Sequence, residues 1–227
     1  MGFDIYYFVL VVPTLILSLW AQFFVKSTFS KYSKIPCSRS ITGREAADLL
    51  MQKNGINDVS IERVQGSLTD HYAPGAKKLR LSEPVYQQPT ISAVGVAAHE
   101  AGHAIQHATH YGPLALRSGL VPIANIGSSI GPWLAIAGLM VSFPLLINLG
   151  ILLFAGSVMF YLITLPVEFN ASARALKLLQ SENVLNASEL KGARKVLTAA
   201  ALTYVASALT ALMSLLRLIL LSRSRRR

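Results

Sequence analysis

The stretch VAAHEAGHAIQHATH, from Val96 to His110, contains four of the five histidines of a 227-residue chain and a single acidic residue, Glu100. Most of the residues between the histidines are small and apolar, which favours a helix. Either the stretch is an apolar helix that happens to carry imidazoles, or its histidines bind a metal ion. The rest of the sequence decides between these alternatives.

The composition of the chain is unlike that of a water-soluble protein. Apolar residues make up 52% of the chain and charged residues only 14%, whereas a soluble domain has about 25% charged residues. Lipid is therefore the expected neighbour of much of the surface. The net charge of +10 indicates contact with anionic lipid rather than with nucleic acid, because the basic residues lie between apolar runs without interleaved aromatic residues. We expect a lipid bilayer as a partner and no nucleic acid.

Four apolar runs are expected to be transmembrane helices. Residues 5–24 carry no charge and form an uncleaved anchor, since an acidic rather than a basic residue precedes them and no clear cleavage site follows. Residues 119–143 and 145–166 form a hairpin that enters the membrane and returns. The last run, 199–221, precedes a basic tail. These runs divide the chain into an anchor (1–25), a polar region (26–118), a hairpin (119–166), a polar helix (167–198) and an apolar helix with the tail (199–227).

The polar region is expected to contain both helices and strands. Apolar residues recur at helical spacing over 41–55, with Gly55 as the stop, and residues 59–64 resemble a strand. Residues 71–82 predict a Pro-Gly turn and a short strand. The helix that carries the histidines is capped by Thr90 or Ser92 and ends near Gly112. In the hairpin, glycines at positions 127, 131 and 138 suit close helix packing in lipid.

Residues 99–103 form the motif HExxH. On a helix, positions i and i+4 share one face, so His99 and His103 can reach one metal ion. Glu100 can approach water on that ion without binding the ion, and Gly102 leaves room beside it. This arrangement is typical of zinc-activated hydrolysis, in which the glutamate takes a proton from the water and passes it to the leaving amine. We interpret His99 and His103 as ligands of Zn²⁺ and Glu100 as the catalytic residue.

A third ligand is needed, because catalytic zinc usually has three protein ligands and one open position. Glu168 is the first charged residue after the third apolar run, and the hairpin returns the chain to the membrane face of His103. We therefore predict Glu168 as the third ligand. The alternative is that Glu168 only marks the membrane boundary or the start of a helix. Two imidazoles and a carboxylate favour zinc, although they do not exclude other divalent ions.

The remaining histidines and the single cysteine are interpreted as structural. His107 lies four residues after His103, but no acid stands between them, so His107 and His110 are expected to be polar residues near the end of a helix. Cys37 alone can form neither an intrachain disulfide nor a thiol-based zinc site.

Asp70, His71 and Tyr72 permit two interpretations. A histidine or tyrosine near the metal could stabilise an oxyanion, or Asp70 begins a turn whose tip is Pro74-Gly75, which turn chemistry favours. As a hypothesis from the order of elements, Leu79–Ser82 is an edge strand that pairs with an extended substrate.

The segments AAHEAGHAIQHA, LTDHYAPGAKKLRLSEPVY and LPVEFNASARAL together resemble the neutral zinc metallopeptidases of bacterial membranes, the YugP-like family. The order of elements is also similar to that of HtpX-type and CAAX-prenyl membrane peptidases. The resemblance implies a mainly α membrane protein with about four transmembrane helices and a zincin-like catalytic region that contains a small β element. It also implies the roles given above to His99, Glu100, His103 and Glu168. In many such enzymes an Asp four residues after the glutamate ligand braces a histidine; here that position is Ser172, and Ser172, Asn170 or a backbone carbonyl could replace it.

The leading hypothesis is a multi-pass cell-membrane zinc metalloendopeptidase acting on membrane-associated polypeptides. A site-2-type intramembrane protease is an alternative, although the chain lacks the Asp-Gly dipeptide of such enzymes. A non-catalytic membrane scaffold or metal-binding protein is a further alternative, which Glu100 argues against because ligation alone does not need it.

The distribution of basic residues favours a cytoplasmic catalytic face. Basic residues follow the first apolar run and recur in residues 167–198. With four complete spans, however, Arg223, Arg225, Arg226 and Arg227 would lie outside. Either the last run is interfacial or re-entrant, or the orientation is inverted.

Overall fold

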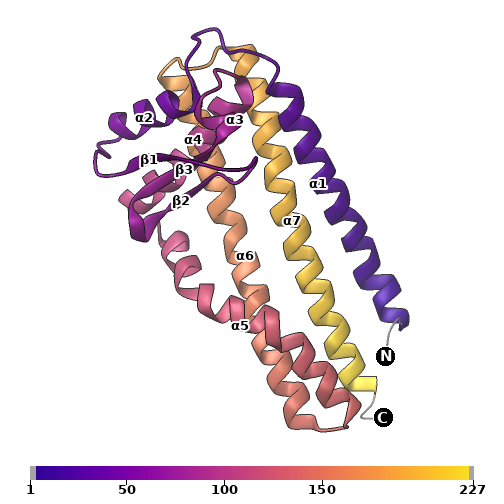
Figure 1. Ribbon diagram of the computed structural model, residues 1–227. Coiled ribbons are helices and arrows are strands. Elements are labelled where there is room, and N and C mark those ends of the chain that lie inside the picture. The colour runs from indigo at the N-terminus through magenta and orange to yellow at the C-terminus, as the bar shows by residue number, and fades with distance from the viewer. Residues whose placement is uncertain (1–3, 225–227) are drawn as a thin grey trace. The chain divides into compact units, whose positions relative to one another are not determined.

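The computed structural model describes residues 4–224, which form two compact units. Unit 1 contains the residues up to 22, residues 115–166 and the residues from 202 onward, and unit 2 contains residues 23–114 and 167–201. Four helices contribute residues to both units: α1 (Val12–Tyr32), α5 (Gly112–Met140), α6 (Pro144–Ser181) and α7 (Ala187–Ser224). Figure 1 shows these helices and their labels. The described chain is mainly helical with one small sheet, as the sequence predicts.

Unit 1 is built from apolar helical segments. A π-helical turn (Tyr7–Val11) leads into α1, α5 (Gly112–Met140) is followed by the first part of α6, and the second half of α7 completes the unit. Within residues 4–224, four helices are long and apolar enough to cross a membrane, which confirms the predicted number. The α5 helix starts earlier than the predicted span and tolerates two internal prolines.

Close backbone contact holds α5 and α6 together. A Cβ atom at Gly127 would lie 2.1 Å from the Leu153 carbonyl oxygen, and one at Gly150 would lie 2.3 Å from the Ala135 amide nitrogen. Lipid gives no hydrophobic drive for helix association, so such approach supplies the van der Waals contact instead. The glycines predicted for packing therefore have this role, together with Gly150 on the partner helix.

An ion pair joins the two ends of the chain within unit 1. The Arg217 guanidinium on α7 donates to the Asp4 carboxylate, with Nη2 and Oδ2 2.5 Å apart, and lies 5.0 Å from the centre of the Tyr7 ring. Charged groups in apolar surroundings are usually paired in this way. The pair therefore ties the start of α1 to α7.

Unit 2 contains a three-stranded sheet of β1 (Ser60–Val64), β2 (His71–Ala73) and β3 (Lys78–Ser82) in the order β1-β3-β2 (Figure 1). The β3 strand is parallel to β1 and antiparallel to β2. The hypothesis that Leu79–Ser82 is an edge strand is therefore wrong, because β3 is the central strand and its residues 78–80 are paired on both sides. The predicted Pro-Gly turn is a 3-10 turn, Pro74–Ala76, and it has β2 as a second strand before it.

The helices of unit 2 begin at the capping residues that their sequences provide. Thr42 and Glu45 form a capping box at α2 (Gly43–Lys53), and Thr90 caps α4 (Ile91–Ala108) by accepting a hydrogen bond from the Ala93 amide. A single turn, α3 (Glu83–Tyr86), links β3 to α4. The α4 helix ends four residues before Gly112, where the left-handed His110 turns the chain toward α5.

The segment predicted as one polar helix, residues 167–198, is interrupted. The α6 helix runs without a break from the apolar span to Ser181, and a turn then leads to α7. Asn183 adopts a left-handed conformation in this turn, and the adjacent Val184 and Leu185 are buried. The Asn186 side chain accepts hydrogen bonds from the amides of Ser188 and Glu189 and so caps α7.

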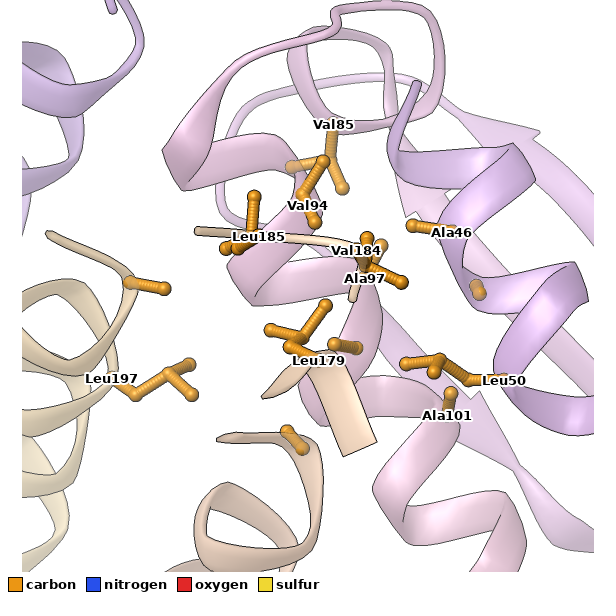
Figure 2. Packing of buried hydrophobic residues seen from close by; sticks show 14 of the residues in the cluster. Ala46, Leu50, Val85, Val94, Ala97, Ala101, Leu179, Val184, Leu185 and Leu197 are labelled. Atoms are coloured by element: carbon orange, nitrogen blue, oxygen red, sulfur yellow. The ribbon is translucent and has the colours of Figure 1, made fainter. Parts of the chain in front are cut away.

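The core of unit 2 surrounds α4. Fourteen of its eighteen residues are buried, as expected for a helix that is apolar on nearly every face. Small side chains on α4 let its neighbours come close, and larger side chains from α2, α6, α7 and the turn between α6 and α7 fill the remaining space. Figure 2 shows Ala97 and Ala101 of α4 among Leu50, Leu179, Val184, Leu185 and Leu197.

The α4 and α6 helices approach each other closely at Gly102. A Cβ atom at Gly102 would lie 2.7 Å from the carbonyl oxygen of Ala171. The sequence suggested that Gly102 leaves room beside a metal ion, but the backbone of α6 occupies that space. Gly102 therefore sets the distance between the histidines on α4 and the residues on α6.

The substitution Gly102→Ala should separate the two helices. The added methyl group meets backbone atoms that cannot move aside, so we expect a loss of about 1–3 kcal/mol of stability and a lower midpoint in a detergent thermal-aggregation assay. The control is Gly75→Ala, because a Cβ atom at Gly75 meets no atom within 4 Å. Equal midpoints for the two variants would contradict this account of α4–α6 packing.

Candidate metal centre

The three predicted ligands lie together on facing sides of α4 and α6. The His99 and His103 rings, one turn apart on α4, have centres 4.7 Å apart. Glu168 extends from α6, and its Oε2 atom lies 3.2 Å from His99 Nε2 and 3.6 Å from His103 Nε2. One ligand atom from each residue lies within 4.8 Å of the others, which makes this a group able to hold a metal ion.

The group is largely shielded from solvent. Glu168 is 2% exposed and His103 8% exposed, whereas His99 is partly accessible. A carboxylate in such surroundings loses its hydration and needs a compensating positive charge. His99 is therefore the member of the group that retains contact with solvent.

Ser172 lies beside His99, one helical turn after Glu168. Its Oγ atom is 3.0 Å from His99 Nδ1, so the two side chains form a hydrogen bond. Of the three replacements considered for the absent Asp, Ser172 is the group in contact with this histidine. Because Nδ1 is engaged, Nε2 of His99 is the nitrogen that faces Glu168.

His103 is held by Gln106, which the sequence analysis did not single out. Gln106 is fully buried and its Oε1 atom lies 3.0 Å from His103 Nδ1. The Gln106 amide nitrogen donates to the Val167 carbonyl at 2.9 Å and to Asn170 Oδ1 at 3.0 Å. The signal in the sequence was a polar residue on an apolar helix, three positions after a ligand and thus on the same face.

The Gln106 contacts determine which His103 nitrogen carries a proton. A carbonyl oxygen only accepts, so the Gln106 nitrogen must face Val167 and the Gln106 oxygen must face His103. His103 Nδ1 therefore donates its proton to Gln106. A neutral His103 then directs the lone pair of Nε2 toward the carboxylate of Glu168.

A lone pair and a carboxylate oxygen at this distance repel each other unless a cation or a proton lies between them. Burial alone would lower the pKa of His103, but the carboxylates of Glu168 and Glu100 outweigh burial and raise it. The cluster thus favours positive charge at the point where the three ligand atoms converge. Two imidazoles and one carboxylate also match the donor set of catalytic zinc sites, so the residues present fit the predicted metal.

Glu100 lies next to His99 on α4 and is 8% exposed. Its carboxylate has no hydrogen bond or ion pair with any residue between 4 and 224, so no described neighbour occupies its lone pairs. Its negative charge contributes to the raised pKa of both His103 and Asp70, which places the carboxylate within electrostatic range of each. Glu100 is thus near the cluster without belonging to the group of three.

The other candidates surround the cluster without joining it. The Tyr72 hydroxyl lies 2.9 Å from His107 Nδ1 and so connects β2 to the end of α4. The Asp70 carboxylate accepts hydrogen bonds from the Ser82 amide and hydroxyl, and burial raises its pKa. Asp70 is therefore tied to the end of β3, across the hairpin that has Pro74-Gly75 at its tip. His110 is exposed at the left-handed turn that follows α4.

Comparison with known proteins gives the family. The sequence model of the family described as "Putative neutral zinc metallopeptidase" matches residues 7–223. The chain belongs to this family. It is also 50% identical over 212 residues to the "Putative membrane protease YugP" of Bacillus subtilis (strain 168), an alignment that covers 93% of this chain and 94% of that protein. No solved structure matches the chain.

The family confirms the resemblance drawn from the three sequence segments. With the four apolar helices, it identifies a membrane protein of a zinc peptidase family, whose substrates are polypeptides.

The substitution Gln106→Leu tests the contact with His103. It removes the acceptor for His103 Nδ1 and the hydrogen bonds that Gln106 donates to Val167 and Asn170, so we expect zinc affinity to fall about 10- to 100-fold. Chelator competition on the purified protein would measure this. As a control, Gln180→Leu changes an exposed glutamine at the end of α6 and should not alter zinc affinity. Unchanged zinc affinity in Gln106→Leu would show that the hydrogen bond between His103 and Gln106 is not needed for metal binding.

Proposed function

We propose that this chain is a zinc endopeptidase that cleaves membrane-associated polypeptides, with His99, His103 and Glu168 as the metal ligands. The observation that carries the proposal is the convergence of three donor atoms from α4 and α6, of which those of His103 and Glu168 belong to buried residues. It is supported by Ser172 and Gln106, which orient both Nε2 atoms toward one carboxylate. Such outer contacts are typical of metal-binding histidines.

Zinc at such a site polarises a scissile carbonyl and makes water a better nucleophile at neutral pH. In our proposal a side chain of the protein carries out the proton transfer. Glu100 takes the proton of the attacking water and delivers it to the leaving nitrogen. A carboxylate without other hydrogen-bond partners suits this role, because no bond has to break before the proton moves.

The proposal differs from its alternatives in the use of Glu100. A scaffold or metal-storage protein needs the three ligands but gains nothing from a fourth carboxylate beside them. A site-2-type protease would use a distant Asp-Gly motif, and the chain contains no Asp-Gly dipeptide.

The substitution Glu100→Gln should separate metal binding from catalysis. The amide keeps the shape of the side chain but cannot accept the proton, so we expect about one zinc per chain by elemental analysis and loss of at least about 100-fold in activity. Internal cleavage of β-casein in detergent, followed by mass spectrometry, would measure the activity. The control is Glu189→Gln, because Glu189 is a buried glutamate of α7 that caps a helix.

The ligand assignment predicts a different result for Glu168→Ala, which should lose both zinc and activity. A Glu100→Gln variant with full activity would refute the catalytic role of Glu100. A Glu168→Ala variant with a full complement of zinc would refute the ligand set.

We further propose that the catalytic face is cytoplasmic. The support is the positive-inside rule applied to the basic residues of unit 2, namely Lys26, Lys31, Lys34, Arg39, Arg44, Arg174, Lys177, Lys191, Arg194 and Lys195. Arg223 at the other end of α7 opposes it, and Arg225, Arg226 and Arg227 lie outside the described residues.

Reporter fusions would test this orientation. Alkaline phosphatase inserted after Gly55 should be inactive and green fluorescent protein at the same place fluorescent, because the former folds only outside the cytoplasm. The same pair fused after Arg227 would locate the tail. Active phosphatase at Gly55 would invert the proposed orientation.

A further inference from the structure

A groove of about 610 Å³ lies between α1 and α7 in unit 2, and none of the candidate metal-site residues lines it. The α1 helix contributes Phe24, Thr28 and Lys31, which are spaced by four and three residues and thus share one face. The α7 helix contributes Arg194, Lys195 and Thr198, again within one turn of each other. The groove is therefore formed by two helix faces that meet along their length.

Gly192 brings these two faces together. A Cβ atom at Gly192 would lie 2.7 Å from Cε1 of Tyr32 and 3.0 Å from Cγ2 of Ile91. The Tyr32 ring thus rests directly on the backbone of α7, and Lys31 beside it lies opposite Arg194 and Lys195. The groove is consequently a fixed feature of the packing of unit 2.

Three cations line the groove without acidic partners. Lys31, Arg194 and Lys195 are all exposed, and among residues 4–224 none of them forms an ion pair. The acidic side chain nearest in sequence, Glu189, is buried and accepts hydrogen bonds from Ser38 and Asn186 instead. Three like charges around one groove repel each other, and an anion between them relieves that repulsion.

Most of the groove surface is apolar, with Phe24 and Tyr32 beside the hydroxyl-bearing Ser27, Thr28 and Thr198. The groove lies where the helices change from apolar to charged sequence. Phe24 lies two residues before Lys26, the first charged residue of α1, and Thr198 directly precedes the final apolar run of α7. A membrane boundary falls at such positions, where Lys and Arg contact lipid phosphates. An occupant must therefore offer an anionic group next to an apolar chain.

We propose that this groove binds an anionic phospholipid, whose phosphate is held by Lys31, Arg194 and Lys195 and whose acyl chain lies along Phe24. Charge complementarity selects the headgroup. The apolar lining distinguishes a lipid from a free phosphate, which would gain nothing from Phe24.

Native mass spectrometry of the full-length, delipidated protein in detergent would test the proposal. The probes are dioleoyl phosphatidylglycerol and dioleoyl phosphatidylcholine, which share their acyl chains and differ in net charge. We expect one phosphatidylglycerol per chain to bind at least tenfold more tightly than phosphatidylcholine. Equal binding of the two lipids would overturn the proposal.

Charge variants would locate the bound lipid. The combination Lys31→Gln, Arg194→Gln and Lys195→Gln should weaken phosphatidylglycerol binding at least tenfold. The control, Lys26→Gln, Lys34→Gln and Lys177→Gln, removes the same charge from exposed residues of unit 2 outside the groove and should leave binding unchanged. Equal losses in the two variants would show that only total charge matters, and would refute the site.

A second variant keeps the cations and fills the space. Thr198→Trp should exclude the lipid, whereas Thr198→Ser should not, and this pair gives an answer even if the charge variant fails to fold. Retained binding in Thr198→Trp would refute the groove as the site. Inorganic phosphate in large excess should not displace phosphatidylglycerol, and displacement would assign the cations to free phosphate instead.

Discussion

The buried carboxylate of Glu168 is the group on which the arrangement of unit 2 depends. At 2% exposure it has lost nearly all contact with water, and an uncompensated charge in that position would cost several kcal/mol. The imidazoles of α4 and the cation they can share supply the compensation. For that, α6 must pass close to α4, and Gly102 permits this by leaving space for the Ala171 carbonyl. The close packing of α4 against α6 thus both compensates the charge of Glu168 and brings the candidate metal ligands together.

The packing of α4 against α6 also fixes the two histidines through their Nδ1 atoms. Gln106 can serve as the acceptor for His103 because its amide is anchored by the Val167 carbonyl, which belongs to the residue next to Glu168 on α6. Ser172, also on α6, orients His99 by a hydrogen bond with its Nδ1 atom. One turn and a half of α6, from Val167 to Ser172, therefore provides a carboxylate and orients both imidazoles that face it.

The sequence predicted what depends on a single helix and missed what depends on its neighbours. The spacing of His99 and His103 follows from helical geometry alone, and the two apolar spans between them and Glu168 made it reasonable to bring that residue back to the same region. Gln106 was missed because its role depends on its hydrogen bonds to α6, and the spacing of residues along α4 does not reveal contacts with another helix. The central position of β3 was missed for the same reason, since strand order is decided by pairing between segments and not by their sequences one at a time.

The break between α6 and α7 illustrates a further limit. Residues 182–186 contain no proline or glycine that would stop a helix. Asn183 nevertheless adopts a left-handed conformation, and Val184 and Leu185 enter the core of unit 2. Burial of two apolar side chains outweighs the continuation of a helix, and that burial exists only once α4 is in place. Helix propensity alone therefore predicted one continuous helix over residues 167–198, whereas the packing of unit 2 requires two helices joined by a turn.

The distribution of charge separates the two units by chemistry. The described residues of unit 1 carry four charged side chains, Asp4, Arg117, Arg217 and Arg223, and two of these form an ion pair with each other. Nearly all other charges, the sheet and the three convergent donors belong to unit 2. Glu168 follows directly on the last residues that α6 contributes to unit 1, and Pro166 at that junction cannot donate a helical hydrogen bond. The helix thus changes from lipid-compatible sequence to site residues within two positions. A metal ion bound by this group would draw its ligands from a protein core, where backbone and amide partners can orient them.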